Sequence, residues 1–274
     1  LYPSGKVSPV QERQIAALGG NVHALEVTGD FDDCQALVKR AFADADLRSR
    51  VYLTSANSIN VARWLPQQLY YALAWKQWRD PSNPPLISVP SGNFGNIGAG
   101  LLLQRSGLPV PHFLAACNAN DAVPSFLETG AFVRRPAQPT LSNAMDVADP
   151  SNFVRIQALF GNDRAALRTV LRATRTTDDE TRATIRKVAD NYGYVLDPHT
   201  AVAWHGLEQV LGEEAPGLAL STAHPVKFPD VVAEETGRPV PYPASVDALM
   251  QQPLSPQKME NQYEPLRALL LTLS

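Results

Sequence analysis

The stretch Ser88-Val-Pro-Ser-Gly-Asn-Phe-Gly-Asn-Ile-Gly-Ala-Gly100 decides the fold. An apolar strand is predicted over residues 86–89, and Pro90 ends it. A loop of serine, glycine and asparagine follows, and a helix is predicted over residues 97–104. A strand that runs through a short glycine-rich loop into a helix is one unit of an α/β fold.

The glycines of this loop have a chemical consequence. Gly92 and Gly95 would let the backbone approach a ligand closely and adopt positive φ. The loop leads into a helix N-terminus, where unpaired N–H groups and the positive end of the helix dipole attract anions. We therefore predict a cradle for a phosphate group. An ordinary strand–helix turn would show the same pattern, and the loop alone does not separate the two.

The remaining elements repeat this alternation. The first half predicts strands at residues 22–27, 51–54, 86–89 and 113–117, and helices at 8–18, 34–43, 58–78 (kinked at Pro66), 97–104 and 122–129. The second half predicts helices at residues 152–160, 164–173, 178–191, 197–210 and 264–273, with a last core strand at 219–221. Strands that alternate with helices predict a doubly wound parallel sheet with flanking helices, in which ligands bind at the carboxyl ends of the strands.

Composition excludes several classes of protein. The 274 residues suffice for one large domain or two smaller ones, and the formal charge is −3. The acidic balance and the scattered Lys and Arg argue against nucleic acid as a partner. No apolar run approaches the roughly 18 residues of a membrane span, and no signal peptide pattern is present. Cys34 and Cys117 fit no metal spacing, so we expect reduced thiols in a cytoplasmic protein.

A second group of polar residues follows the predicted strand at 51–54. Asn57, Asn60 and Arg63 are spaced to share one side of a helix, and Ser58 lies near its N-cap. A guanidinium with amide and hydroxyl donors at a helix start would form a second anion site. A capped helix with a solvated arginine would carry the same residues.

Two further polar segments have open roles. In residues 220–228, a Ser or Thr hydroxyl would hydrogen-bond an aromatic ring nitrogen. His224 is either functional or packed in the loop. Lys227 is expected at the surface. Asp197 and Pro198 are typical of a helix start, and direct participation of His199 or Thr200 stays open. The polar loop 141–146 suggests no mechanism, and no histidine pair has metal-ligand spacing.

Several of these segments resemble threonine synthases, in the same order. The strongest are Thr54-Ser-Ala-Asn-Ser-Ile-Asn-Val-Ala-Arg63, Val89-Pro-Ser-Gly-Asn-Phe-Gly-Asn96 and Ser221-Thr-Ala-His-Pro-Val-Lys-Phe228. Leu1-Tyr-Pro-Ser-Gly-Lys-Val-Ser8, Leu141-Ser-Asn-Ala-Met-Asp146 and Asp197-Pro-His-Thr-Ala201 also resemble that family. The resemblance runs nearly from end to end, and motifs of this length do not recur in order by accident of composition.

The resemblance implies the tryptophan-synthase-β-like fold (fold type II) and pyridoxal phosphate (PLP) as cofactor. The family converts O-phosphohomoserine and water to threonine and phosphate. The implied cofactor-binding residues are Gly92, Asn93, Phe94, Gly95 and Asn96, which would hold the phosphate, and Thr222, which would meet the pyridine nitrogen. The implied substrate-binding residues are Asn57, Ser58, Asn60, Arg63 and, in a supporting role, Asn93.

The chain also departs from the family pattern. The Schiff-base lysine of the family lies in a Phe-Lys-Asp context, which none of the lysines has (Lys6, Lys39, Lys76, Lys187, Lys227 and Lys258). The Ser-Gly-Asp-Thr-Gly type of loop is missing as well. We therefore expect the C-terminal two-thirds of a threonine synthase, inactive by itself. Its expected parts are residues 1–133 (cofactor and substrate phosphate), 134–192 (irregular and helical) and 193–274 (completing the large domain).

Two alternatives remain. One is another enzyme of the same fold, such as a serine/threonine dehydratase or a cysteine synthase, which would not need a second phosphate site. The other is a non-catalytic threonine-synthase-like protein that binds PLP or a phosphorylated metabolite. The oligomeric state and regulation have no sequence signature.

Overall fold

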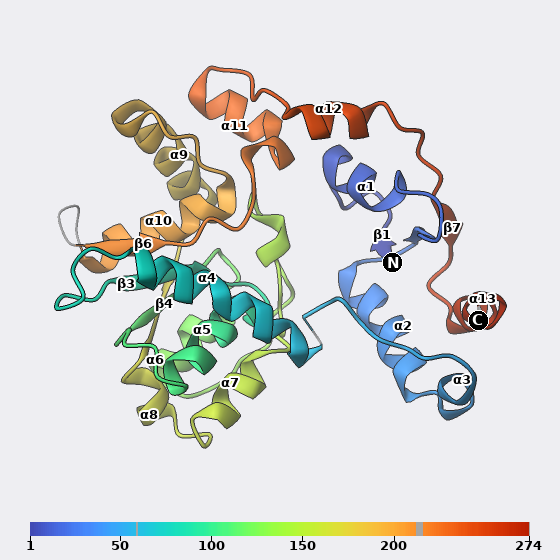
Figure 1. The fold of residues 1–274 in the computed structure, drawn as a ribbon, viewed down its shortest axis with the longest axis horizontal. Coiled ribbons are helices and arrows are strands. Elements are labelled where there is room, and N and C mark those ends of the chain that lie inside the picture. The colour runs from blue at the N-terminus through green and yellow to red at the C-terminus, as the bar shows by residue number, and fades with distance from the viewer. Residues whose placement is uncertain (59, 212–215, 274) are drawn as a thin grey trace. The chain divides into compact units, whose positions relative to one another are not determined.

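The computed structural model describes residues 1–58, 60–211 and 216–273. The chain forms two compact units, Leu1–Ser55 with Pro241–Ser274, and Ala56–Val240. Each unit has its own parallel sheet with helices beside it (Figure 1). The sequence-based boundaries after residues 133 and 192 both fall inside the second unit, and the three-part division stays a prediction.

The first unit is built from both ends of the chain. Its sheet has the order β1-β2-β7, with all strands parallel: β1 (Tyr2–Pro3), β2 (Leu25–Val27) and β7 (Gln257–Met259). Its helices are α1 (Pro9–Ala16), α2 (Phe31–Ala43), α3 (Ala45–Arg50), α12 (Ala244–Met250) and α13 (Tyr263–Thr272). Ser8 and Gln11 form a reciprocal capping box at the start of α1, which confirms that predicted helix start.

The second unit contains a four-stranded sheet of order β5-β4-β3-β6, all parallel. Its strands are β3 (Leu86–Pro90), β4 (Phe113–Cys117), β5 (Leu171–Arg175) and β6 (Gly217–Ala219). Its α-helices are α4 (Trp64–Gln77), α5 (Gly95–Arg105), α6 (Ala122–Thr129), α7 (Phe153–Leu159), α8 (Arg164–Arg168), α9 (Asp178–Tyr192), α10 (Pro198–Leu211) and α11 (Pro229–Thr236). Short 3₁₀ turns are η1 (Val61–Arg63), η2 (Asn143–Met145) and η3 (Pro225–Lys227).

Both faces of the second sheet are covered. Every residue of β3 and β4 is buried, as expected for central strands with helices on each side. Ile87 and Val89 pack with Ile97 of α5 in one apolar cluster. On the opposite face, the Ser88 hydroxyl donates to the Ala203 carbonyl of α10 at 2.8 Å. The predicted doubly wound parallel sheet is confirmed.

Two predicted elements are wrong. The strand at 51–54 does not form: residues 52–56 have no regular structure, and Tyr52 is 96% exposed. Val51 and Leu53 are partly buried against an apolar cluster of the first unit, but no described strand pairs with this segment. The helix at 164–173 ends early, as α8, and its last residues enter β5. Pairing of β5 with β4 provides backbone hydrogen bonds and burial of Leu171, which outweigh local helix preference.

The helix predicted over residues 58–78 begins later. Asn60 caps the turn η1 by accepting the Ala62 N–H at 3.1 Å, and α4 starts at Trp64. Pro66 therefore lies in the first turn of α4, where proline is tolerated, and no kink is required. Ile59, part of that predicted helix, lies outside the described residues. No helix of the described part of the chain is long and apolar enough to cross a membrane.

Candidate functional site

The candidate site lies at the carboxyl edge of the second sheet. Because its four strands are parallel, the segments that follow them meet at one edge. Residues 91–96 follow β3 and Asn118 follows β4. The N–H of Leu220 donates to Ser88 at 3.0 Å, which continues the pairing of β6 with β3 and brings Thr222 to the same edge.

The loop between β3 and α5 presents free backbone donors. Ser91 N–H still donates to Ala116 of β4, but the N–H groups of residues 92–96 donate to no group among the described residues. Phe94 has φ 60°, which turns the chain into α5 at Gly95. This arrangement is a helix N-terminus with available N–H groups, and it can bind a phosphate.

Close approach, and not positive φ, explains the glycine at position 92. A Cβ on Gly92 would lie 2.5 Å from the Cα of Met145. The expected positive φ at Gly92 and Gly95 is wrong, since the left-handed residue of the loop is Phe94. The polar loop 141–146, which had no predicted role, thus packs against residues 91–96, the predicted phosphate loop.

Long-range hydrogen bonds fix the phosphate loop. The Asn93 side-chain oxygen accepts from the Ser151 N–H at 2.6 Å, and the Asn93 carbonyl accepts from the Asn152 amide at 3.0 Å. At the start of α5, the Tyr71 hydroxyl lies 2.7 Å from the Asn96 side-chain oxygen. Both Asn152 and Tyr71 are fully buried. These anchors hold the loop without using its N–H groups.

The second predicted anion group lies beside the first. The Asn93 amide donates to the Ser58 hydroxyl at 2.6 Å, and Ser58 donates to Asn57 at 3.2 Å. Residues 57, 58 and 60 precede η1 and are not helical, so the expected helical spacing of this group is wrong. Tertiary contacts bring Ser58 to the loop instead, and the Arg155 guanidinium holds it there by donating to the Ser58 carbonyl at 3.0 Å.

A cleft of about 560 Å³ is lined by residues of both predicted anion-binding groups, the loop 91–96 and the segment 57–63. Its wall includes Arg63, Asn96, Ser221 and Thr222, together with side chains of α4. The Arg63 guanidinium donates to the Ala56 carbonyl, and the side chain is exposed. Thr222 is exposed too, and its hydroxyl makes no hydrogen bond with a described residue. The cleft therefore presents a cation, a polar amide and two hydroxyls to a ligand.

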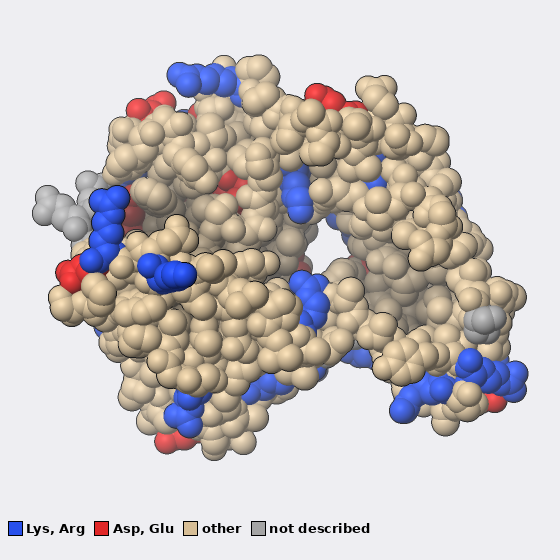
Figure 2. Space-filling view, viewed as in Figure 1, with Lys and Arg blue, Asp and Glu red and all other residues tan. Residues whose placement is uncertain are grey.

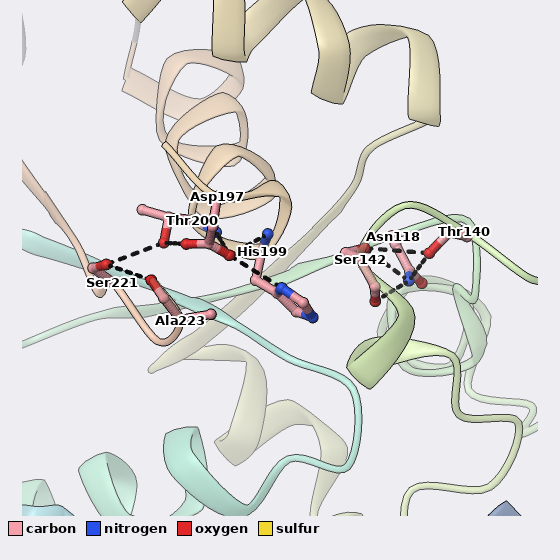
Figure 3. Close-up of polar contacts among 8 residues, drawn as sticks. All are labelled: Asn118, Thr140, Ser142, Asp197, His199, Thr200, Ser221 and Ala223. Carbon is pink, nitrogen blue, oxygen red and sulfur yellow. Dashed lines mark hydrogen bonds and ion pairs between the residues drawn. The ribbon is translucent and has the colours of Figure 1, made fainter. Parts of the chain in front are cut away.

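A buried network supports the loop 141–146 at the end of β4 (Figure 3). The Asn118 amide donates to Thr140 at 2.8 Å and to Ser142 at 3.1 Å. It also donates to the Asp146 carboxylate at 2.9 Å. Burial raises the pKa of Asp146, and the hydrogen bonds from Thr140 and Asn118 oppose that rise. This network holds Met145 against Gly92.

Residues 1–222 match the family model described as pyridoxal-phosphate dependent enzyme, which covers most of the chain. The chain belongs to this family. Residues 200–270 also match the model described as threonine synthase, C-terminal.

Among members of the pyridoxal-phosphate dependent enzyme family, threonine synthases are similar over the whole chain. A threonine synthase of Serratia marcescens is 44% identical over 274 residues, 100% of this chain and 63% of that protein. One of Haemophilus influenzae is 43% identical over 99% of this chain and 64% of that protein. The crystal structure of Escherichia coli threonine synthase superposes with a TM-score of 0.92 at 41% identity, covering 100% of this chain and 64% of that one.

The resemblance to threonine synthases and the fold expected from it are therefore confirmed. A PLP-bound threonine synthase from Brucella melitensis superposes with a TM-score of 0.87 at 37% identity, over 99% of this chain and 64% of that one. This chain thus spans slightly less than two thirds of the length of the relatives it matches.

This member of the pyridoxal-phosphate dependent enzyme family carries site residues that sequence reasoning missed. Ser151, Asn152, Tyr71 and Arg155 come from elements remote in sequence from the loop they support. No local motif marks these residues as part of a site. The run Pro150-Ser151-Asn152 is a typical signal for the start of a helix, but it does not indicate a contact with the loop.

The described residues offer no cluster of metal-ligating side chains. On the face shown in Figure 2, Lys and Arg side chains are spread out and Asp and Glu lie among them. Among the described residues, no group of three or more His, Cys, Asp or Glu side chains could hold a metal ion. Cys34 and Cys117 are both buried, free thiols, and burial raises the pKa of each.

Proposed function

We propose that the protein is a threonine synthase, which converts O-phosphohomoserine and water to threonine and inorganic phosphate with PLP as cofactor. One observation carries the proposal: two groups of anion-binding donors lie side by side, joined by the Asn93–Ser58 hydrogen bond at 2.6 Å. A phosphorylated cofactor and a phosphorylated substrate require two such groups. The similarity to threonine synthases over the whole chain supports the same function.

The residues present fit the cofactor. The N–H groups of Gly92, Asn93, Phe94, Gly95 and Asn96, which have no partner among the described residues, would bind its phosphate. The Thr222 hydroxyl, which bonds to no residue in the described part of the chain, would meet the pyridine nitrogen and, being neutral, would leave that nitrogen largely unprotonated. When bound, PLP supplies an electron sink for the bonds of the amino-acid substrate.

The substrate phosphate would bind on the α4 side. Ser58 would donate a hydroxyl, Asn57 and Asn60 would contribute amides, and Arg63 would provide a charge-assisted pair. Asn93 would assist from the cofactor loop, because its amide already contacts Ser58. In this scheme Arg63 would orient the substrate phosphate and, with it, the rest of the substrate in the cleft.

None of the lysines in this chain is proposed as the covalent attachment point of PLP. They are Lys6, Lys39, Lys76, Lys187, Lys227 and Lys258, and none has the sequence context expected for that role. Lys187, for example, forms an ion pair with Glu208 at 3.3 Å on the surface of α9. The chain by itself is therefore expected to bind phosphate but not to turn over, and a lysine elsewhere in the full protein would complete the site.

Turnover by the full-length protein tests the function. With PLP and O-phosphohomoserine, threonine and inorganic phosphate should form in equal amounts. Serine and threonine should give no 2-oxo acid, which separates a threonine synthase from a dehydratase. PLP binding without either reaction would favour the non-catalytic alternative and contradict the proposal.

Chemical mapping tests the lysine assignment. The full-length protein loaded with PLP is reduced with borohydride, digested and analysed by mass spectrometry. We expect one stoichiometric adduct outside these six lysines. A single stoichiometric adduct at one of the six would contradict the assignment, and Lys227, which follows Thr222 most closely, would then be the first residue to examine.

A further inference from the structure

Asp197 is a buried carboxylate that the proposed function does not use. It is 1% exposed and lies at the start of α10, next to the carboxyl edge of the sheet. One oxygen, Oδ1, accepts from the His199 N–H at 2.9 Å and lies 3.1 Å from His199 Nδ1. The other, Oδ2, accepts from the Thr200 hydroxyl. One carboxylate thus orients two neighbouring side chains (Figure 3).

Both of those side chains reach the loop that carries Thr222. Thr200 Oγ1 lies 3.3 Å from the Ser221 hydroxyl, the residue immediately before Thr222. The His199 ring packs on Phe228, with ring centroids 5.0 Å apart. The loop 221–228 is therefore held by the start of α10 near each of its ends, and Asp197 lies behind both contacts.

The network is more than a helix cap. A cap needs only the contacts of Asp197 with backbone N–H groups, which Asp197 makes to His199 and Thr200. The side-chain bonds are additional and point toward the loop. The second nitrogen of His199, Nε2, is buried and has no hydrogen-bond partner among the described residues, so Nδ1, beside Asp197, carries the ring's hydrogen bond there.

We propose that Asp197 is a positioning residue that acts through Thr200 and His199 to hold the Thr222 hydroxyl at the cofactor-ring end of the cleft. This inference rests on the proposed function, in which Thr222 meets the pyridine nitrogen. By this inference, the Asp197-Pro-His-Thr segment affects the binding of the cofactor ring and not the binding of the cofactor phosphate or the substrate phosphate.

Binding measurements on the full-length apo-protein test this role. The variants are Thr200→Val, Thr200→Ser and Thr184→Val. Thr184 is a matched control, because it is a buried threonine (3% exposed) whose hydroxyl binds the Glu180 carbonyl of its own helix. PLP and inorganic phosphate are titrated separately, and thermal unfolding is recorded for each variant.

Thr200→Val should weaken PLP binding by about three- to tenfold, the effect of one lost hydrogen bond. Thr200→Ser should stay within about twofold of the wild type, because it keeps the hydroxyl. Phosphate binding should not change in any variant, and Thr184→Val should lose stability but not PLP affinity. Asp197→Asn combined with Thr200→Val should weaken PLP binding no more than the stronger single change, since the two residues act as one unit.

Three results would overturn the inference alone. The first is PLP affinity that is equal in Thr200→Val and Thr184→Val, and the second is a loss that is as large for phosphate as for PLP. The third is additivity of the Asp197 and Thr200 changes. Absence of PLP binding by the wild type would instead remove the proposed function itself, and this inference with it.

Discussion

The Asn93 side chain links two loops at once: its amide nitrogen donates to Ser58 at 2.6 Å, and its oxygen accepts from the Ser151 N–H at 2.6 Å. The residue after Gly92 thus fixes the relative position of the phosphate loop and the segment before α4. Any ligand that spans the two donor groups depends on this one side chain.

Replacing Asn93 by alanine should therefore weaken the binding of both proposed ligands, PLP and O-phosphohomoserine. The change removes the contact with Ser58 and leaves the partly buried Ser151 N–H unsatisfied, a loss of about 1–3 kcal/mol. We expect a higher Kd for PLP and a higher KM for O-phosphohomoserine, each by about five- to tenfold or more. Asn83→Ala is the control, because Asn83 is exposed in the turn before β3. An effect on only one of the two ligands would contradict the linking role.

A methyl group at position 92 should displace the phosphate loop. In Gly92→Ala the new Cβ would lie 2.5 Å from the Met145 Cα, and a backbone atom cannot move aside cheaply. Overpacking of this kind costs about 1–3 kcal/mol, and we expect PLP affinity to fall by about tenfold or more. Gly161→Ala is the comparison for PLP affinity. An added Cβ at Gly161 meets no neighbouring atom, so this change strains only the backbone, through its positive φ. Normal PLP binding by Gly92→Ala would show that the loop can shift without consequence.

Arg63 should matter for the substrate and not for the cofactor. Arg63→Ala should remove a charge-assisted contact of about 1.5–3 kcal/mol, so kcat/KM for O-phosphohomoserine should fall by about 10- to 150-fold. The absorbance of bound PLP should stay unchanged. Arg79→Ala, a change of another exposed arginine of the second unit, should leave both unaffected. Lost PLP absorbance with normal substrate use would reverse the assignment.

Asp44 should make the stability of the protein dependent on pH in acid. The Leu47 N–H, the Tyr263 hydroxyl and the Arg267 guanidinium lower the pKa of Asp44 to about 2. Because the folded-state pKa is lowered, the stabilisation is complete above the ordinary pKa of 3.8 and is lost as the pH falls through about 2.

Urea unfolding between pH 7 and pH 2.5 measures this contribution. Asp44→Asn should be less stable than the wild type at pH 7, and the difference should shrink as the pH falls below about 4. Asp32→Asn, which changes an exposed carboxylate at the start of α2, should show no such convergence. A constant difference between wild type and Asp44→Asn across this range would rule out the ionised pair as its source.

The sequence correctly predicted those elements that are determined by residues close to one another in the chain. The capping box of Ser8 and Gln11 marked α1, and the apolar run before Pro90 marked β3. The step from β3 through the glycine loop to α5 was also predictable, because strand, loop and helix are consecutive in sequence. The N–H groups that we propose as phosphate donors lie in that step.

Features that depend on distant partners were not predictable. Residues 171–175 form a strand only because β4 offers an open edge, and residues 51–54 lack such an edge. Tyr71 and Asn152 support the phosphate loop from other elements, and nothing in their neighbourhoods shows this. Ser58 was predicted to lie at a helix N-terminus, but no helix begins there. It belongs to the site because it bonds to Asn93.

The place of β6 beside β3 has a consequence for synthesis of the protein. β3 emerges from the ribosome before both of its neighbours, and the second of them, β6, is made only after β4, β5 and α10. Until then one edge of an entirely buried strand has no partner, and such an edge readily pairs with other chains. Thr222 emerges directly after β6, so the strand that closes the sheet also completes the binding cleft. A nascent chain that stops before Gly217 would therefore carry the phosphate loop on an open, aggregation-prone sheet.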